Sequence, residues 1–287
     1  MYAPQIGGAQ TTAFDLQFPS EGISPLSLAV TPIFHLANDG TQTVLSHGTG
    51  FFWIHNDQHY LISARHVFSG RDPFTDEIMS PNGFTPQRIY IFPAVSSATE
   101  YTRGTAPLEC SLYNDDETPR WLEDPQFATL RTDIAALRVE ITNTQTHRLI
   151  TLNSEPFSTS LFTQVGIECS LLGYPTKNVT NMMTPVWRRG AIASEPRLPI
   201  DGKPMFLLDA TTSSGFSGAP VFRRHWGPLP TRQADGTLSV EVGSVLKTEF
   251  VGVYAGRLAH TQVGGETPFV FYSNRISYVL QQDTEQT

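Results

Sequence analysis

Ser217 has the surroundings that a nucleophilic serine needs. It lies in the segment GFSGAP, residues 215–220, which leads directly into an apolar run. A serine attacks only when a tight turn exposes its hydroxyl and gathers backbone N–H groups beside it. Gly215 and Gly218 allow the backbone conformations of such a turn, and Pro220 stiffens its exit. The segment predicts a nucleophile followed by a strand, which differs from the strand-to-helix elbow of Gly-x-Ser-x-Gly enzymes.

His66 and Asp133 are the residues that could activate this serine. His66 ends the run LISARH, residues 61–66, in which small residues let a neighbouring group approach closely. Asp133 opens the apolar run 134–137, and aspartate is disfavoured in strands, so it either caps a turn or serves a partner. Taken singly, each also has a purely structural interpretation: a half-buried histidine, a turn aspartate and, at Ser217, a glycine-rich turn.

Taken together, the three residues indicate a catalytic triad. They occur in the order histidine, aspartate, serine, as in one class of serine peptidases. The sequence resembles the chymotrypsin-like (trypsin-like) serine peptidases, especially compact bacterial and viral members without disulfides, from about residue 26 to 282. The matching motifs are SARH (63–66), DIA (133–135) and GFSGAP (215–220), supported by LGYP (172–175) and VGVYAG (251–256).

The resemblance implies a fold and a set of roles. The fold would be all-β, with two six-stranded antiparallel β-barrels and the active site between them. His66 would deprotonate Ser217, Asp133 would hold the imidazole, and the N–H groups of Gly215 and Ser217 would form the oxyanion hole. The substrate would be a protein or peptide, and the chemistry needs no metal and no cofactor.

Two departures from the family concern activation and the support of the triad. Vertebrate digestive members carry an aspartate before the nucleophile, which pairs with a newly cut N-terminus; this chain has Phe216 there. We therefore expect no activation through that ion pair. Ala255 replaces a serine that often binds the triad aspartate, which alters the surroundings of Asp133 but not the triad itself.

The resemblance also outlines a specificity pocket without a carboxylate at its base. Cleavage after Lys or Arg is therefore disfavoured, because a buried ammonium would lack its counter-charge. Two alternatives stay open: a neutral pocket for a small or apolar residue, or an inward-facing Arg257 that pairs with an acidic residue. A solvated arginine at a strand end is the simpler interpretation of Arg257. The predicted substrate-binding residues are Thr211, Thr212, Ala255, Gly256, Arg257 and Val270.

The elements that position these residues are predicted to be short strands. The chain of 287 residues contains 22 glycines and 21 prolines, which suits strands joined by turns and disfavours a helical bundle. Polar or turn-rich insertions are expected over 69–87 and 96–124, and a short closing helix over 275–282. The predicted division is an N-terminal extension (1–25), a first barrel carrying the histidine and aspartate (26–145) and a second barrel carrying the serine (146–287).

Composition excludes several other classes. The net charge is −8 and no basic stripe is visible, so we expect no nucleic-acid partner, and no apolar run is long enough for a membrane span. With two cysteines and no signal-like N-terminus, a cytoplasmic location is expected.

Two rival functions remain to be weighed. The first is a zinc site at His47, His55, His59 and His66, but the residues around 56–60 predict a hairpin turn rather than a zinc-binding helix. The second is a catalytically silent or partner-gated interaction module on the same fold, with a regulatory protein as its partner.

Overall fold

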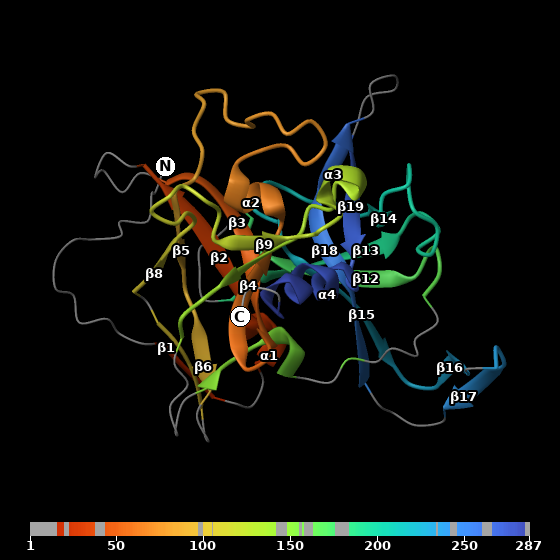
Figure 1. Ribbon diagram of the computed structural model, residues 1–287. Helices are drawn as coiled ribbons and strands as arrows, with labels where there is room; N and C mark the ends of the chain where they lie inside the picture. The colour runs from red at the N-terminus through yellow and green to blue at the C-terminus, as the bar shows by residue number, and fades with distance from the viewer. Residues whose placement is uncertain are drawn as a thin grey trace.

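The computed structural model describes two β-structures that lie side by side (Figure 1). Strands up to β11 build what we call the N-terminal half, and strands from β12 onward build the C-terminal half. Most of the predicted extension over 1–25 lies outside the described residues. These residues are 16–19, 23–37, 44–96, 100–104, 106–141, 148–154, 157, 163–175, 184–233, 235–241, 246–259 and 266–284.

The N-terminal half contains, within the described residues, a seven-stranded and a four-stranded sheet. The larger sheet has the order β8 (Leu108–Ser111), β5 (Arg88–Ile91), β2 (Val30–Leu36), β3 (Val44–His55), β4 (Gln58–Ser63), β10 (Ala135–Arg138) and β9 (Trp121–Glu123). The smaller sheet has the order β1 (Leu16–Pro19), β7 (Glu100–Arg103), β6 (Ala94–Ser96) and β11 (Arg148–Leu149). The β3–β4 hairpin turns through Asn56 and Asp57, both with positive φ, as a two-residue hairpin loop requires.

The C-terminal half is a closed barrel. Its order is β12 (Glu168–Gly173), β13 (Val186–Ile192), β14 (Met205–Asp209), β19 (Glu266–Tyr272), β18 (Leu246–Ala259) and β15 (Pro220–Trp226). A two-stranded hairpin, β16 (Leu229–Arg232) and β17 (Leu238–Glu241), extends away from the barrel in Figure 1. Closure gives each of the six barrel strands a neighbour on both sides, so the barrel itself has no free sheet edge.

The predicted fold class is confirmed, with one difference in the N-terminal half. The chain is mostly β, and the C-terminal half is the expected six-stranded barrel. In the N-terminal half, the main sheet instead has seven strands among the described residues, because β8 and β9 come from the segment 96–124. The prediction of that segment as a surface insertion was wrong: it forms strands of only three or four residues, which are too short to stand out within a polar segment.

Short helices connect and close the sheets. They are α1 (Pro25–Ala29), α2 (Arg65–Ser69), α3 (Phe127–Leu130) and α4 (Arg275–Leu280), with the 3₁₀ turns η1 (Leu152–Ser154) and η2 (Gln281–Thr284). The predicted closing helix is therefore present as α4, which lies between the two halves in Figure 1. In the part of the chain that the structure describes, no helix is long and apolar enough to cross a membrane.

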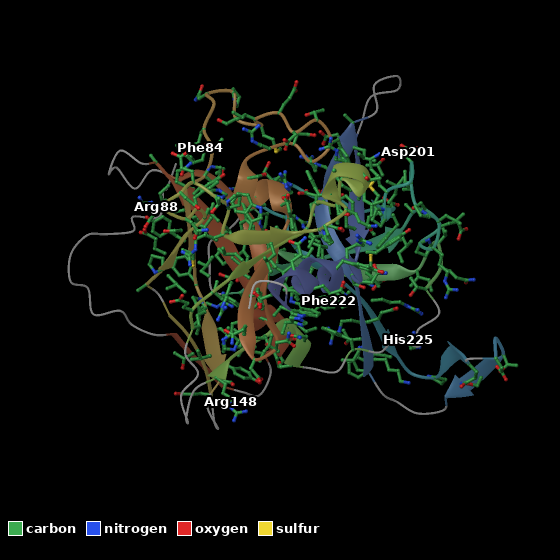
Figure 2. All side chains as sticks on the ribbon, viewed as in Figure 1. Phe84, Arg88, Arg148, Asp201, Phe222 and His225 are labelled. Carbon is green, nitrogen blue, oxygen red and sulfur yellow. The ribbon has the colours of Figure 1, made fainter. Side chains whose placement is uncertain are left out.

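The two halves share one apolar core. The largest buried cluster combines Phe51 and Ile134 of the N-terminal half with Phe222 and Phe271 of the barrel. Figure 2 shows Phe222 near the middle of the molecule, surrounded by side chains from both sides. Because this interior is continuous, the groups that each half contributes to the interface are held in a fixed relation.

Candidate active site

The strand register of the N-terminal half brings His66 and Asp133 together. β10 pairs with β4 so that Ala135 lies opposite Ser63, which places Asp133, just before β10, beside the first turn of α2. Asp133 is fully buried. Its Oδ1 accepts the backbone N–H of His66 at 2.8 Å, and its Oδ2 lies 2.6 Å from His66 Nδ1. The carboxylate therefore fixes both the backbone and the ring of His66.

The same contacts decide the protonation of the imidazole. A carboxylate can only accept, so Nδ1 must carry the proton and Nε2 is left as the proton acceptor. Burial lowers the pKa of His66, but the charge and hydrogen bond of Asp133, with a smaller contribution from Asp72, raise it above its ordinary value. The ring is thus a stronger base than a free histidine, with its free nitrogen available to a partner.

Ser217 lies in a tight turn, residues 213–219, which we call the nucleophile loop. Gly215 and Gly218 have φ of +96° and +87°. A Cβ at Gly215 would come within 2.2 Å of the Tyr174 carbonyl oxygen, and one at Gly218 within 2.1 Å of the Thr49 carbonyl oxygen. Both positions therefore require glycine for conformation and for space.

The backbone N–H groups of this loop fall into two kinds. The N–H of Gly218 donates to the Tyr254 carbonyl at 2.8 Å. Within the described residues, the N–H groups of Gly215 and Ser217 donate to no protein acceptor, although Gly215 is buried. Buried N–H groups without a partner are rare, so this pair is available to an oxygen atom of a bound molecule.

A cleft of about 910 Å³ joins these groups. His66, Gly215 and Ser217 all line it. One wall comes from the loop 70–86 after α2, and the other from the end of β18. The hydrogen bonds of the described residues do not include one between the Ser217 hydroxyl and the His66 imidazole. Such bonds are often long in proteins without substrate and shorten when substrate binds.

The predicted specificity residues divide into two sets. Ala255, Gly256 and Arg257 line the cleft, whereas Thr211, Thr212 and Val270 are not among its lining residues. Thr211 is exposed, and Val270 is fully buried in the apolar core of the barrel.

Arg257, for which sequence left two alternatives, forms an ion pair. Its Nη1 lies 2.6 Å from Glu266 Oε2, and both side chains are partly exposed. The guanidinium therefore already has a carboxylate partner on the neighbouring strand.

Several cleft residues were not among the predicted site residues. Phe74 and Phe269 reach each other from opposite walls, with ring centroids 5.7 Å apart. Tyr254 lines the cleft as well, and its hydroxyl lies 2.8 Å from Thr212 Oγ1. The signal for Tyr254 and Phe269 was their position next to residues that the motifs did identify. Phe74 had no such signal, because the segment that carries it matches no motif.

The histidines considered for zinc are dispersed. His55 and His59 lie on the two strands of the β3–β4 hairpin, as the predicted turn requires. His47 lies on β3 beside Gly215, and burial lowers the pKa of its imidazole. His66 is engaged with Asp133. Among the described residues, no three histidine, cysteine, aspartate or glutamate side chains form a group that could hold a metal ion.

Comparison with known proteins places the chain in a family. No curated protein matches it. Among solved structures it is similar to the crystal structure of the Rv3671c protease in an inactive form, over 90% of this chain and 89% of that one, with 17% identity and a TM-score of 0.41. Residues 48–228 match the trypsin-like peptidase domain. Because that match covers more than half of the sequence, this chain belongs to the trypsin-like peptidase domain family.

Proposed function

We propose that the chain is a serine endopeptidase that acts through Ser217, His66 and Asp133. The observation that carries this proposal is the pair of hydrogen bonds that Asp133 accepts from His66, which lines the same cleft as Ser217. A buried carboxylate that fixes a histidine tautomer in this way leaves Nε2 free to accept a proton inside the cleft.

The chemistry then proceeds in two stages. The Ser217 hydroxyl gives its proton to His66 Nε2 while its oxygen bonds to the peptide carbonyl carbon. The oxygen that becomes negative is received by the N–H groups of Gly215 and Ser217, each worth roughly 10²–10³ in rate. His66 returns the proton to the leaving amine as the C–N bond breaks, which leaves an acyl-enzyme. Water, deprotonated by His66, then hydrolyses the ester and restores Ser217.

A fluorophosphonate probe tests this function directly. Such probes phosphonylate a serine only when a base and an oxyanion hole activate it. We expect the purified chain to be labelled at Ser217, with labelling lost in Ser217→Ala and in His66→Ala. A folded wild-type chain that takes up no probe would instead favour the interaction-module alternative.

We further propose that the residue before the scissile bond is small or apolar. The pairing of Arg257 with Glu266 supports this, since neither charge is left free for a substrate side chain. Phe269 and Tyr254 support it too, because their bulk lies where the cleft meets β18. A positional-scanning peptide library gives the preference. Strong selection for Lys or Arg would overturn this proposal, and selection for Asp or Glu that is lost in Arg257→Ala would restore the arginine alternative.

A further inference from the structure

Thr49 of β3 lies at the contact between the N-terminal half and the nucleophile loop. It is fully buried. Its backbone N–H donates to the Ser217 carbonyl oxygen at 2.8 Å. Its own carbonyl oxygen accepts the Ser63 hydroxyl at 2.7 Å, so Thr49 is itself tied to β4. Thr49 thus connects the strand that leads into α2, the helix of His66, with the loop that carries Ser217.

The hydroxyl of Thr49 makes two further bonds, both to the C-terminal half. Oγ1 donates to the Gly215 carbonyl oxygen at 2.6 Å and accepts the Tyr174 backbone N–H at 3.0 Å. A threonine hydroxyl has one hydrogen to donate, and here that hydrogen is used on the nucleophile loop. Each of these groups is buried, so the loss of the hydroxyl would leave a buried donor and a buried acceptor without a partner.

The two carbonyl groups that Thr49 holds lie on either side of one peptide bond. Gly215 O is bound by the hydroxyl and Ser217 O by the backbone N–H. Between them lies the Phe216–Ser217 peptide, whose N–H is one of the two donors without a protein acceptor among the described residues, and Ser217 lines the cleft. With both carbonyls fixed, this peptide cannot rotate freely, although Gly215 itself imposes little restriction on the chain.

The loop also has backbone hydrogen bonds to Tyr254 and an apolar support. Phe216 is fully buried and packs against Gly173, where an added Cβ would come within 2.5 Å of its ring. Among the described residues, no ion pair involves the nucleophile loop. The Thr49 hydroxyl is therefore the side-chain group that holds Gly215 by hydrogen bonding.

We propose that Thr49 is a positioning residue. Its hydroxyl holds the nucleophile loop in the conformation in which the N–H groups of Gly215 and Ser217 can bind an oxyanion. The inference rests on the proposed peptidase function and deepens it. Thr49 touches neither substrate nor the reacting atoms; it acts through the carbonyl group of Gly215. The proposal predicts that the hydroxyl matters for the transition state far more than for substrate binding.

The test compares Thr49→Val, which removes the hydroxyl at nearly constant shape, with Thr49→Ser, which keeps it. We expect kcat of Thr49→Val to fall on the order of 10- to 100-fold with little change in KM, and Thr49→Ser to recover most of the loss. A peptide aldehyde provides a second readout, since its adduct with Ser217 places an oxyanion in the same site. Its affinity for Thr49→Val should fall in parallel with kcat.

Thr31 provides a matched control. It is also fully buried, on the adjacent strand β2, and its hydroxyl likewise accepts an N–H, from Phe92 at 2.9 Å, and lies 3.1 Å from the Pro32 carbonyl oxygen. Neither partner lines the cleft. Thr31→Val should lower thermal stability about as much as Thr49→Val while leaving kcat at the wild-type value.

Each outcome decides between the two proposals. If Thr49→Val and Thr31→Val both keep wild-type kcat and aldehyde affinity, the positioning role is overturned and the peptidase function stands. If the wild-type chain itself neither cleaves peptides nor takes up a fluorophosphonate, the proposed function fails and the inference falls with it. Should Thr49→Val not fold, Thr49→Cys keeps a weak donor of similar size; a partial loss of kcat supports the proposal, and full activity overturns it.

Discussion

The two walls of the cleft hold their functional residues in different ways. On the N-terminal side, a buried charge fixes His66: Asp133 binds both its backbone and its ring. On the C-terminal side, neutral groups hold the nucleophile loop: the hydroxyl of Thr49 from β3, the backbone of two glycines and the ring of Phe216. A base must become an imidazolium, which a carboxylate stabilises, whereas a nucleophile loop needs only a fixed shape. The pH dependence of activity should therefore come from the titration of His66.

Charge also supports the region behind His66, away from the cleft. Arg65 lies 2.5 Å from Glu123 and stacks on Phe127 at 3.9 Å. The neighbouring carboxylate of Asp124 is buried and bound by Arg275 of α4, at 2.5 Å for the shortest contact. In the proposed mechanism, the charge next to the imidazole serves the chemistry, whereas the charges behind it join α4 to the N-terminal half.

The largest expected effect on activity comes from removing the hydroxyl of Ser217. Ser217→Ala should lower kcat by a factor on the order of 10⁶. The fold should survive, because the hydroxyl makes no hydrogen bond among those of the described residues. Steady-state kinetics with a peptide substrate, alongside a thermal melt of the same sample, checks both statements. Hydrolysis that persists in a folded Ser217→Ala would show that the nucleophile lies elsewhere.

Asp133→Asn should have the next largest effect and should also shift the pH profile. The asparagine cannot stabilise the imidazolium and favours the wrong tautomer, so kcat should fall by a factor on the order of 10⁴. His66 must be neutral to accept a proton, so activity rises as pH passes its pKa. Asp133 raises that pKa, and its removal should move the rise in activity to lower pH. An unchanged rise in a pH–rate profile would assign the titration to another group.

The motifs predicted the triad because each of its residues occupies a locally determined position. A glycine turn before an apolar run, or an aspartate before a strand, can be recognised within a few residues. The positioning role that we propose for Thr49 could not be recognised in this way. Its hydroxyl bonds to Gly215, which is remote in sequence, and only the packing of the two halves brings them together.

The specificity pocket shows a second limit of sequence reasoning. Sequence predicted Val270 as a substrate-binding residue, whereas in the structure Val270 lies in the barrel core and its neighbour Phe269 lines the cleft. Successive residues of a strand face opposite sides, so an uncertainty of one position exchanges a lining residue for a core residue. The register of β18 against β19, including the irregularity between Tyr254 and Gly256, is set by the whole barrel.

Arg275→Met should show that the charges behind His66 contribute to stability and not to activity. The change leaves Asp124 buried without its partner, so the free energy of unfolding should fall by about 3–5 kcal/mol. Activity per folded molecule should remain, since Arg275 does not line the cleft. Arg88→Met is the control: its ion pair with Glu109 is about half exposed, and its loss should cost less than about 1 kcal/mol. Denaturant melts measure both, and equal losses would remove the distinction between the two regions.

Removal of residues from the N-terminus should have the smallest effect. A new α-amino group could organise the nucleophile loop only by pairing with a buried carboxylate, and the residue before Ser217 is Phe216, whose ring fills the space beside Gly173. Hydrogen bonds from neutral groups already hold the nucleophile loop, so cleavage near the N-terminus should not change its conformation. We expect the intact chain, verified by mass spectrometry, to react with a burst titrant as fully as a chain trimmed before residue 16. A burst that appears only after trimming would mean that the neutral groups do not hold the nucleophile loop in its active conformation by themselves. The new α-amino group would then have to form a contact that does so.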